Sequence, residues 1–119
     1  MEKVNIAQKL SLFTEHWSPK IVGELNGQLV KLVKLKGEFV WHQHDHEDEL
    51  FYVISGVLTM QFRDKTVMVN EGEFIIVPSG VEHRPVAEEE VAVMLFEPAS
   101  TLNTGDAESD FTKNVLERL

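Results

Sequence analysis

Residues 37–56 read GEFVWHQHDHEDELFYVISG. Two apolar runs, FVW and LFYVI, flank a polar centre. Short runs rich in aromatic and β-branched residues are typical of strands, and a polar stretch between two of them is typical of a turn. We therefore expect a hairpin, with strands at Glu38–His44 and Glu49–Ile54 joined by a turn at Asp45–Asp48.

The same alternation of short strands and turns extends along most of the chain. Turn-forming pairs such as Asn26-Gly27 and Ser55-Gly56 separate the expected strands. Many short strands at this spacing predict an all-β fold, a small jelly roll or β-barrel, rather than a βαβ fold. Besides the hairpin, the expected strands are Lys20–Leu25, Gln28–Lys36, Val57–Arg63, Thr66–Val69, Glu73–Val77, His83–Ala87 and Val91–Glu97.

Short helices are expected at both ends of the chain. In Asn5–Phe13, three apolar residues recur at helical spacing, and Asn5 is a candidate N-cap. Ser109–Leu119 carries a similar apolar stripe, with Ser109 as its candidate cap. The expected organisation is a single domain over residues 1–119, made of an N-terminal helical segment (1–18), a β-barrel (20–98) and a tail with a C-terminal helix (99–119).

Composition excludes several classes of function. The chain has 119 residues, a net charge of −9 and no cluster of Lys and Arg, which argues against partners such as nucleic acid or an anionic membrane. It has no cysteine, which removes thiol nucleophiles, iron–sulfur clusters and disulfides and fits a reducing compartment. The first residues do not resemble a signal peptide, so we expect a cytoplasmic protein.

Histidines and one glutamate form a candidate metal site. His42 and His44 lie two residues apart on an expected strand, so their side chains project to the same face. The turn that follows can bring Glu49 across from His44, and the tight turn Pro78-Ser79-Gly80 can aim His83 at the same point. Three imidazoles and one carboxylate suit one divalent transition metal per chain, namely Fe, Mn, Ni or Zn. Four protein ligands on an octahedral ion leave two positions open.

Other ionisable residues have weaker claims to a role. His46 lies in the acidic turn and is expected to be solvated, and His16 is expected at the surface or in packing contacts. Glu73 and Glu82 are candidate general bases, although both are ordinary surface positions. Tyr52 has the opposite strand parity to the candidate ligand Glu49, so we expect it to face away from the metal.

The histidine and glutamate residues resemble the two motifs of the cupin superfamily, in particular those of small single-domain bacterial cupins. The first motif runs from Gly37 to Gly56, with one residue fewer than usual between Gly37 and His42, and the second runs from Gly72 to His83. The family often has Asn where this chain has Ala87. The resemblance covers roughly residues 27–98. It implies a small jelly-roll barrel, a homodimer, and a metal held by His42, His44, Glu49 and His83.

The segment from Glu97 to Asp106 also resembles the tail of short bacterial cupins. We expect it to fold over one mouth of the barrel or against a partner chain. The alternative is a plain surface connection to the last helix.

Three functions remain open from the sequence. One is a metal-dependent cupin that binds a small polar metabolite in the barrel and catalyses an isomerisation or a dioxygenation. The second is a metal-containing module that binds or senses a small molecule without turnover. The third is a scaffold with a vestigial metal site. The candidate apolar walls of the ligand pocket are Val40, Phe51, Val53, Met60, Phe62, Ile76 and Met94.

Overall fold

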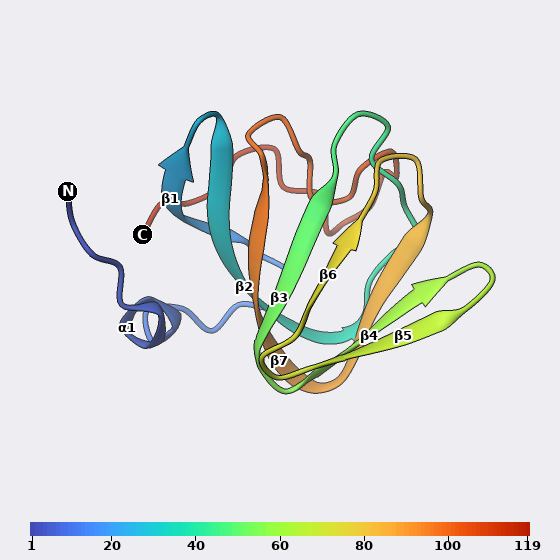
Figure 1. Cartoon of the computed structure of the whole chain (residues 1–119), viewed down its shortest axis with the longest axis horizontal. Coiled ribbons are helices and arrows are strands. Elements are labelled where there is room, and N and C mark those ends of the chain that lie inside the picture. Colours follow the sequence, from blue (N-terminus) through green and yellow to red (C-terminus); the bar gives the residue numbers. More distant parts are fainter.

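The computed structural model describes all residues from 1 to 119 and consists mainly of antiparallel β-strands (Figure 1). A single short helix, α1 (Ile6–Leu10), precedes them. The all-β prediction is confirmed, and no helix has the length and apolar character needed to cross a membrane. The strands are β1 (Lys20–Leu25), β2 (Gln28–Glu38), β3 (Glu49–Ser55), β4 (Val57–Phe62), β5 (Thr66–Asn70), β6 (Phe74–Val77) and β7 (His83–Pro98).

The longest strand, β7, links the two layers of a barrel-like fold. Its residues 91–98 lie between β2 and β3, in a sheet with the strand order β1-β2-β7-β3-β6. Its residues 83–86 pair instead with β4, and β4 carries β5 at its other edge. Figure 1 shows β7 bending at the bottom of the view as it passes from one layer to the other. One strand therefore ties both layers into a continuous hydrogen-bonded frame.

Two predictions about strands are wrong. The expected strand at Glu38–His44 is absent, because β2 ends at Glu38 and residues 39–48 form a loop. The expected strands at His83–Ala87 and Val91–Glu97 are a single strand, β7. The polar residues 88–90 do not form a turn, because the β2–β7 ladder shifts register at this point and leaves them as an exposed bulge.

The N-terminal helix is shorter than predicted. Asn5 caps it as expected, since its side chain accepts a hydrogen bond of 2.9 Å from the backbone N–H of Gln8. The helix ends at Leu10, however, and none of its residues is buried. The chain beyond it is held by Lys34, whose Nζ donates to the backbone oxygens of Leu10 and Phe13 at 2.9 and 2.7 Å.

The predicted C-terminal helix at Ser109–Leu119 is absent. Apart from one local turn, in which the N–H of Thr112 donates to the oxygen of Ser109, its backbone-to-backbone hydrogen bonds link it to the barrel. The N–H of Ile21 donates to the oxygen of Glu117, and the N–H of Leu119 donates to the oxygen of Ile21, each at 2.9 Å. The Ser109 hydroxyl accepts from the backbone N–H two residues later, a local turn that competes with helix formation.

Apolar side chains from both layers fill the space between them. On β3, Glu49, Phe51 and Val53 point inward and are buried, whereas Leu50 and Tyr52 point outward and are half-buried. This is the alternation expected of a strand with one face on the core. The core cluster consists of Trp17, Val33, Leu35, Phe39, Phe51, Val53, Leu58, Met60, Val69, Val77, Ala87, Val91, Val93 and Leu95.

Two methionines on adjacent strands test this description of the core. Met60 on β4 is completely buried, whereas Met68 on β5 is 54% exposed. We expect Met60→Ala to lower the free energy of unfolding by about 2–5 kcal/mol, because it removes buried atoms and leaves a cavity. The control Met68→Ala should change it by less than about 0.5 kcal/mol. Denaturant unfolding of both variants measures the difference, and equal losses would contradict the assignment.

Candidate metal centre

Four ionisable side chains meet inside the barrel. His42 and His44 lie in the loop of residues 39–48, Glu49 is the first residue of β3, and His83 is the first residue of β7. The backbones of His42 and His83 exchange two hydrogen bonds, of 3.0 and 2.8 Å. This bridge holds the two imidazole centroids 4.3 Å apart. The structure therefore brings together the four predicted ligands from three separate elements.

The four side chains have the spacing of ligands around one ion. One ligand atom from each residue can be chosen so that all four lie within 4.8 Å of one another. Glu49 Oε1 is 3.3 Å from His44 Nε2 and 3.5 Å from His83 Nε2. Donor atoms about 2.0–2.2 Å from a common centre lie at such separations. All four residues are buried, with at most 4% of each exposed.

Backbone carbonyls orient two of the rings. His42 Nδ1 lies 2.9 Å from the oxygen of Val40, and His83 Nδ1 lies 2.9 Å from the oxygen of Val81. A carbonyl oxygen accepts, so each Nδ1 carries the hydrogen and each Nε2 keeps a lone pair. Metal-binding histidines are commonly fixed by a hydrogen bond of this kind at the other ring nitrogen.

Several atoms at the centre of the cluster have no hydrogen-bond partner. These are His44 Nε2, His83 Nε2 and Glu49 Oε1, and all of them are buried. A buried polar atom without a partner is costly and uncommon. Two nitrogen donors and a carboxylate oxygen facing one another fit a divalent metal ion, which supplies the missing interaction to all of them.

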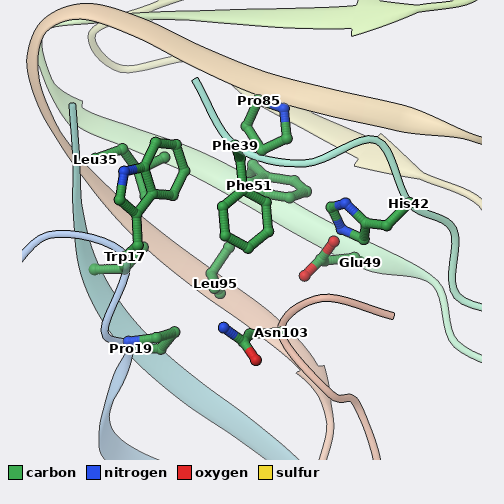
Figure 2. A pocket seen from close by; sticks show the side chains of 11 residues that line it. Trp17, Pro19, Leu35, Phe39, His42, Glu49, Phe51, Pro85, Leu95 and Asn103 are labelled. Atoms are coloured by element: carbon green, nitrogen blue, oxygen red, sulfur yellow. The ribbon is translucent and has the colours of Figure 1, made fainter. Parts of the chain in front are cut away.

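A cavity of about 40 Å³ adjoins the cluster. Figure 2 shows His42 and Glu49 at one side of it and Trp17 at the other, with the ring of Phe39 between them. The remaining lining residues are Pro19, Val33, Leu35, Phe51, Pro85, Leu95 and Asn103.

Comparison with known proteins identifies the family. The profile of the cupin domain family matches residues 29–97, which is more than half of the chain and contains all four candidate ligands. This chain is a cupin.

The similarity of this cupin to solved structures covers most of the chain. A cupin-2 domain protein from Shewanella frigidimarina is 47% identical, with a TM-score of 0.79, over 80% of this chain and 93% of that one. A protein from Neisseria meningitidis is 33% identical, with a TM-score of 0.76, over 82% of this chain and all of that one. The uncharacterized Bacillus subtilis protein YdbB is 38% identical over 64 residues, which are 53% of this cupin and 57% of that protein.

Burial and mutual charge set the protonation of the cupin's site. Burial, followed by the nearby charge of His83, lowers the pKa of His42 to about 4. Burial would also lower the pKa of His44, but the negative charge of the adjacent Glu49 carboxylate outweighs it and raises that pKa. Burial alone would raise the pKa of Glu49, yet the neighbouring side chains, Glu97 first and the two histidines next, hold it well below its ordinary value. The metal-free site therefore pairs an ionised Glu49 with a readily protonated His44.

An ion pair that the sequence analysis missed lies behind Glu49. Lys31 Nζ is 2.7 Å from Glu97 Oε1, and both side chains are 1% exposed. Burial and the negative charge of Glu49 raise the pKa of Glu97 well above its ordinary value. Because Leu50 pairs with Phe96 across β3 and β7, the adjacent residues Glu49 and Glu97 lie side by side on the inner face. The barrel thus contains a second acid that contacts a candidate metal ligand.

Of the seven candidate wall residues, Phe51 lines the cavity, Val53 lies in the core cluster and Ile76 is exposed on β6. Met60 lies within the core cluster, and Val40 packs against that cluster. Phe62 borders a separate surface hollow, and Met94 lies on the outward-facing side of β7. Much of the wall comes instead from β2 and from residues 17–19, which precede the barrel.

The tail folds over the cavity, in line with one of the two expectations for it. Asn103 lines the cavity from this side, as Figure 2 shows. The backbone N–H of Gln43 donates to Asp106 Oδ1 at 2.9 Å, and the N–H of Asp106 donates to the oxygen of Gln43 at 3.0 Å. The ring of Phe111 packs on that of Phe39, with centroids 5.2 Å apart. The tail is therefore docked on the loop that carries two of the candidate ligands.

The other ionisable residues considered from the sequence do not line the cavity. Tyr52 lies on the outer face, as predicted from its parity. Glu82 pairs with an arginine at the surface, and the exposed Glu73 accepts a backbone hydrogen bond in a turn. His46 is exposed, and His16 bonds to a surface glutamate at 2.7 Å.

Metal affinity should depend on pH through His44. Its pKa in the metal-free protein lies above the ordinary value of 6.5, so below that raised pKa a metal ion must displace a proton from the ring. His42, with a pKa of about 4, does not compete until much lower pH. We expect affinity to fall by about tenfold per pH unit, with the decline already under way at pH 6.5. Competition titrations between pH 8 and pH 5 measure this, and a flat profile would contradict histidine ligation.

Proposed function

We propose that this protein is a metal-dependent cupin that holds one divalent transition metal (Fe, Mn, Ni or Zn) and binds a small molecule beside it. The observation that carries the proposal is the set of buried ring nitrogens and a carboxylate oxygen that face one another without hydrogen-bond partners. The ligands would be His42, His44, Glu49 and His83.

The donor set leaves room for a ligand. Three imidazoles and one carboxylate occupy four positions of an octahedral ion, so two positions remain open. His42 and Glu49 line the cavity, which supports open metal positions that face it. When bound, the metal would supply Lewis-acid or redox chemistry to an oxygen-bearing ligand held there.

Of the two expected reactions, the cavity favours dioxygenation over isomerisation. Isomerisation of a sugar or keto acid needs a group that moves a proton between carbons. The ionisable side chains that line the cavity are His42 and Glu49, and both are committed to the metal in this proposal. Glu97 is buried behind Glu49 and paired with Lys31, away from the cavity lining.

The lack of a free acid or base in the cavity also supports a second candidate, a module that binds its ligand without turnover. The two candidates differ in one observable. A bound ligand is consumed over time by an enzyme and persists in a binding module.

We also propose the partners and the location. The partners are a small-molecule ligand and a second copy of the chain, and the net charge of −9 argues against nucleic acid. The cysteine-free composition is in keeping with a reducing compartment, for which we propose the cytoplasm.

The homodimer proposal is supported by an uncharged outer face on the sheet of β3, β6 and the second half of β7. Phe74 and Ile76 on β6 are 60% and 53% exposed. Cross-strand pairing places them beside other outward apolar or aromatic residues, since Ile76 lies opposite Leu50 and Phe74 opposite Tyr52. Such a contiguous apolar face is typical of an interface. Its members are Leu50, Tyr52, Phe74, Ile76, Met94 and Phe96.

Light scattering tests the homodimer. We expect the mass of two chains for the wild type and of one chain for Ile76→Glu, because the substitution would bury a charge in the interface. The control Val57→Glu, at a 44% exposed position on β4, should remain a dimer. A monomeric wild type would contradict the proposal.

Elemental analysis of untagged protein tests the metal site. We expect close to one metal per chain in the wild type and a loss of metal in His42→Ala and in His83→Ala, because each removes one of four ligands. The control is His46→Ala, which removes an exposed histidine from the same loop and should keep its metal. Metal retained in both ligand variants, or absent from the wild type, would contradict the proposal.

A further inference from the structure

The cavity beside the proposed metal is walled almost entirely by apolar side chains. Eight of its eleven lining residues are apolar, aromatic or proline. The rings of Trp17 and Phe39 stack with centroids 4.7 Å apart and an interplanar angle of 15°. Of the three polar lining residues, His42 and Glu49 belong to the metal cluster. A ligand in this space would therefore find its polar contacts on the metal side and apolar surface elsewhere.

The third polar residue is already satisfied. The Asn103 amide donates to the backbone oxygen of Phe111 at 2.8 Å, and its oxygen accepts from the N–H of Lys113 at 2.9 Å. Both bonds lie within the tail, so Asn103 shapes the cover of the cavity and has no free group for a ligand in this arrangement.

No cationic side chain lines the cavity. The nearby buried cation, Lys31, is paired with Glu97 at 2.7 Å and does not line it. A phosphate group or a second carboxylate on the ligand would lose its hydration without gaining a partner, which is strongly unfavourable. Phosphorylated sugars and dicarboxylates thus fit this cavity poorly.

We propose that the ligand is a small molecule with a metal-binding oxygen head, such as a 2-oxo acid, and an uncharged, ring-sized apolar body. This inference rests on the proposed metal site, because the metal ion holds the head. The apolar body lies against Trp17, Phe39 and Phe51, the three aromatic rings of the wall.

The size of the cavity adds a requirement. About 40 Å³ is enough for a few water molecules and too little for a six-membered ring. A ring-sized body therefore enters only if part of the wall is displaced, and in this proposal the displaced part is the tail. The covering segment is the tail, which contains neither helix nor strand and contributes Asn103 to the lining.

The docking of the tail depends on a close backbone contact. Gly105 has a φ of +55°, and a methyl group placed on it would overlap the backbone oxygen of Gln43. Gly105→Ala should therefore lift the tail from the loop. Gly72 on the β5–β6 turn offers a matched control, because its φ is also positive, at +82°, while nothing lies within 4 Å of an added methyl group.

The ligand class is tested with three 2-oxo acids that share one head and differ in their body. Benzoylformate carries a phenyl group, pyruvate a methyl group and oxomalonate a second carboxylate. Calorimetry on Ni(II)-loaded protein should show benzoylformate binding at least about tenfold more tightly than pyruvate, because the ring buries more apolar surface. Oxomalonate should bind more weakly than pyruvate. Benzoylformate that binds no more tightly than pyruvate would overturn the inference.

The tail is tested by the association rate of benzoylformate, followed in stopped flow by the fluorescence of Trp17 in a Trp41→Phe background, since the chain has two tryptophans. We expect Gly105→Ala to bind several-fold faster than the wild type and Gly72→Ala to match the wild type. If Gly105→Ala does not fold, Asp106→Ala serves instead, because it removes the bond from the N–H of Gln43. Equal rates in the wild type and the tail variant would overturn the role of the tail.

The failure of this inference is distinguishable from failure of the proposed function. Protein that takes up no metal overturns both. Protein that holds its metal and binds the three acids with equal affinity, or in the reverse order, overturns the ligand class and leaves the metal site standing.

Discussion

The site of this cupin depends on one backbone bridge, the pair of hydrogen bonds between His42 and His83. The loop of residues 39–48 has no ladder of its own, so this bridge, together with the bond from the N–H of Phe39 to the oxygen of Pro85, ties it to the start of β7. The two imidazole centroids are thereby held 4.3 Å apart, with the rings tilted by 53°, and the loop leads directly into β3, where Glu49 completes the cluster. The loop carries two of the four candidate ligands, and β7, which crosses both layers and carries His83, determines where the loop lies.

The second constraint is the number of ionisable groups inside a small barrel. Besides the three histidines and Glu49, the interior contains Lys31 and Glu97, with 1% of each side chain exposed. An isolated buried charge would be very costly, and a buried ion pair recovers that cost only with good geometry and further hydrogen bonds. The contact of Glu97 with Glu49 connects this pair to the proposed metal site. The polar interior is thus one connected group, and the apolar cavity lies next to it.

Much of this architecture could be predicted from the sequence, because the relevant signals are local. Alternation of apolar residues and turn pairs located most of the strands, and the side chain of Asn5 marked the start of the helix. The spacing of His42, His44 and Glu49, with His83 after a tight turn, indicated the candidate ligands that the fold brings together.

The errors came from contacts between distant segments. The stripe in Ser109–Leu119 has helical spacing, but its backbone bonds to Ile21 on β1. Lys31 alternates with apolar residues on β2 and is buried. Its burial is explained by Glu97 on the neighbouring strand β7, which pairs with it and is far away in the sequence. Strand alternation does not show which of its two faces points inward, so the outward position of Met94 was not predictable from β7 alone. The position of the tail over the cavity follows from its contacts with the barrel, which are distant in sequence.

In the proposed site, three imidazoles and one carboxylate of this chain surround a single metal ion. X-ray absorption spectroscopy of the metal-loaded protein measures this most directly. We expect nitrogen and oxygen donors at about 2.0–2.2 Å from the metal, with the outer scattering pattern of three imidazole rings. A spectrum with oxygen donors alone, or without imidazole scattering, would contradict it.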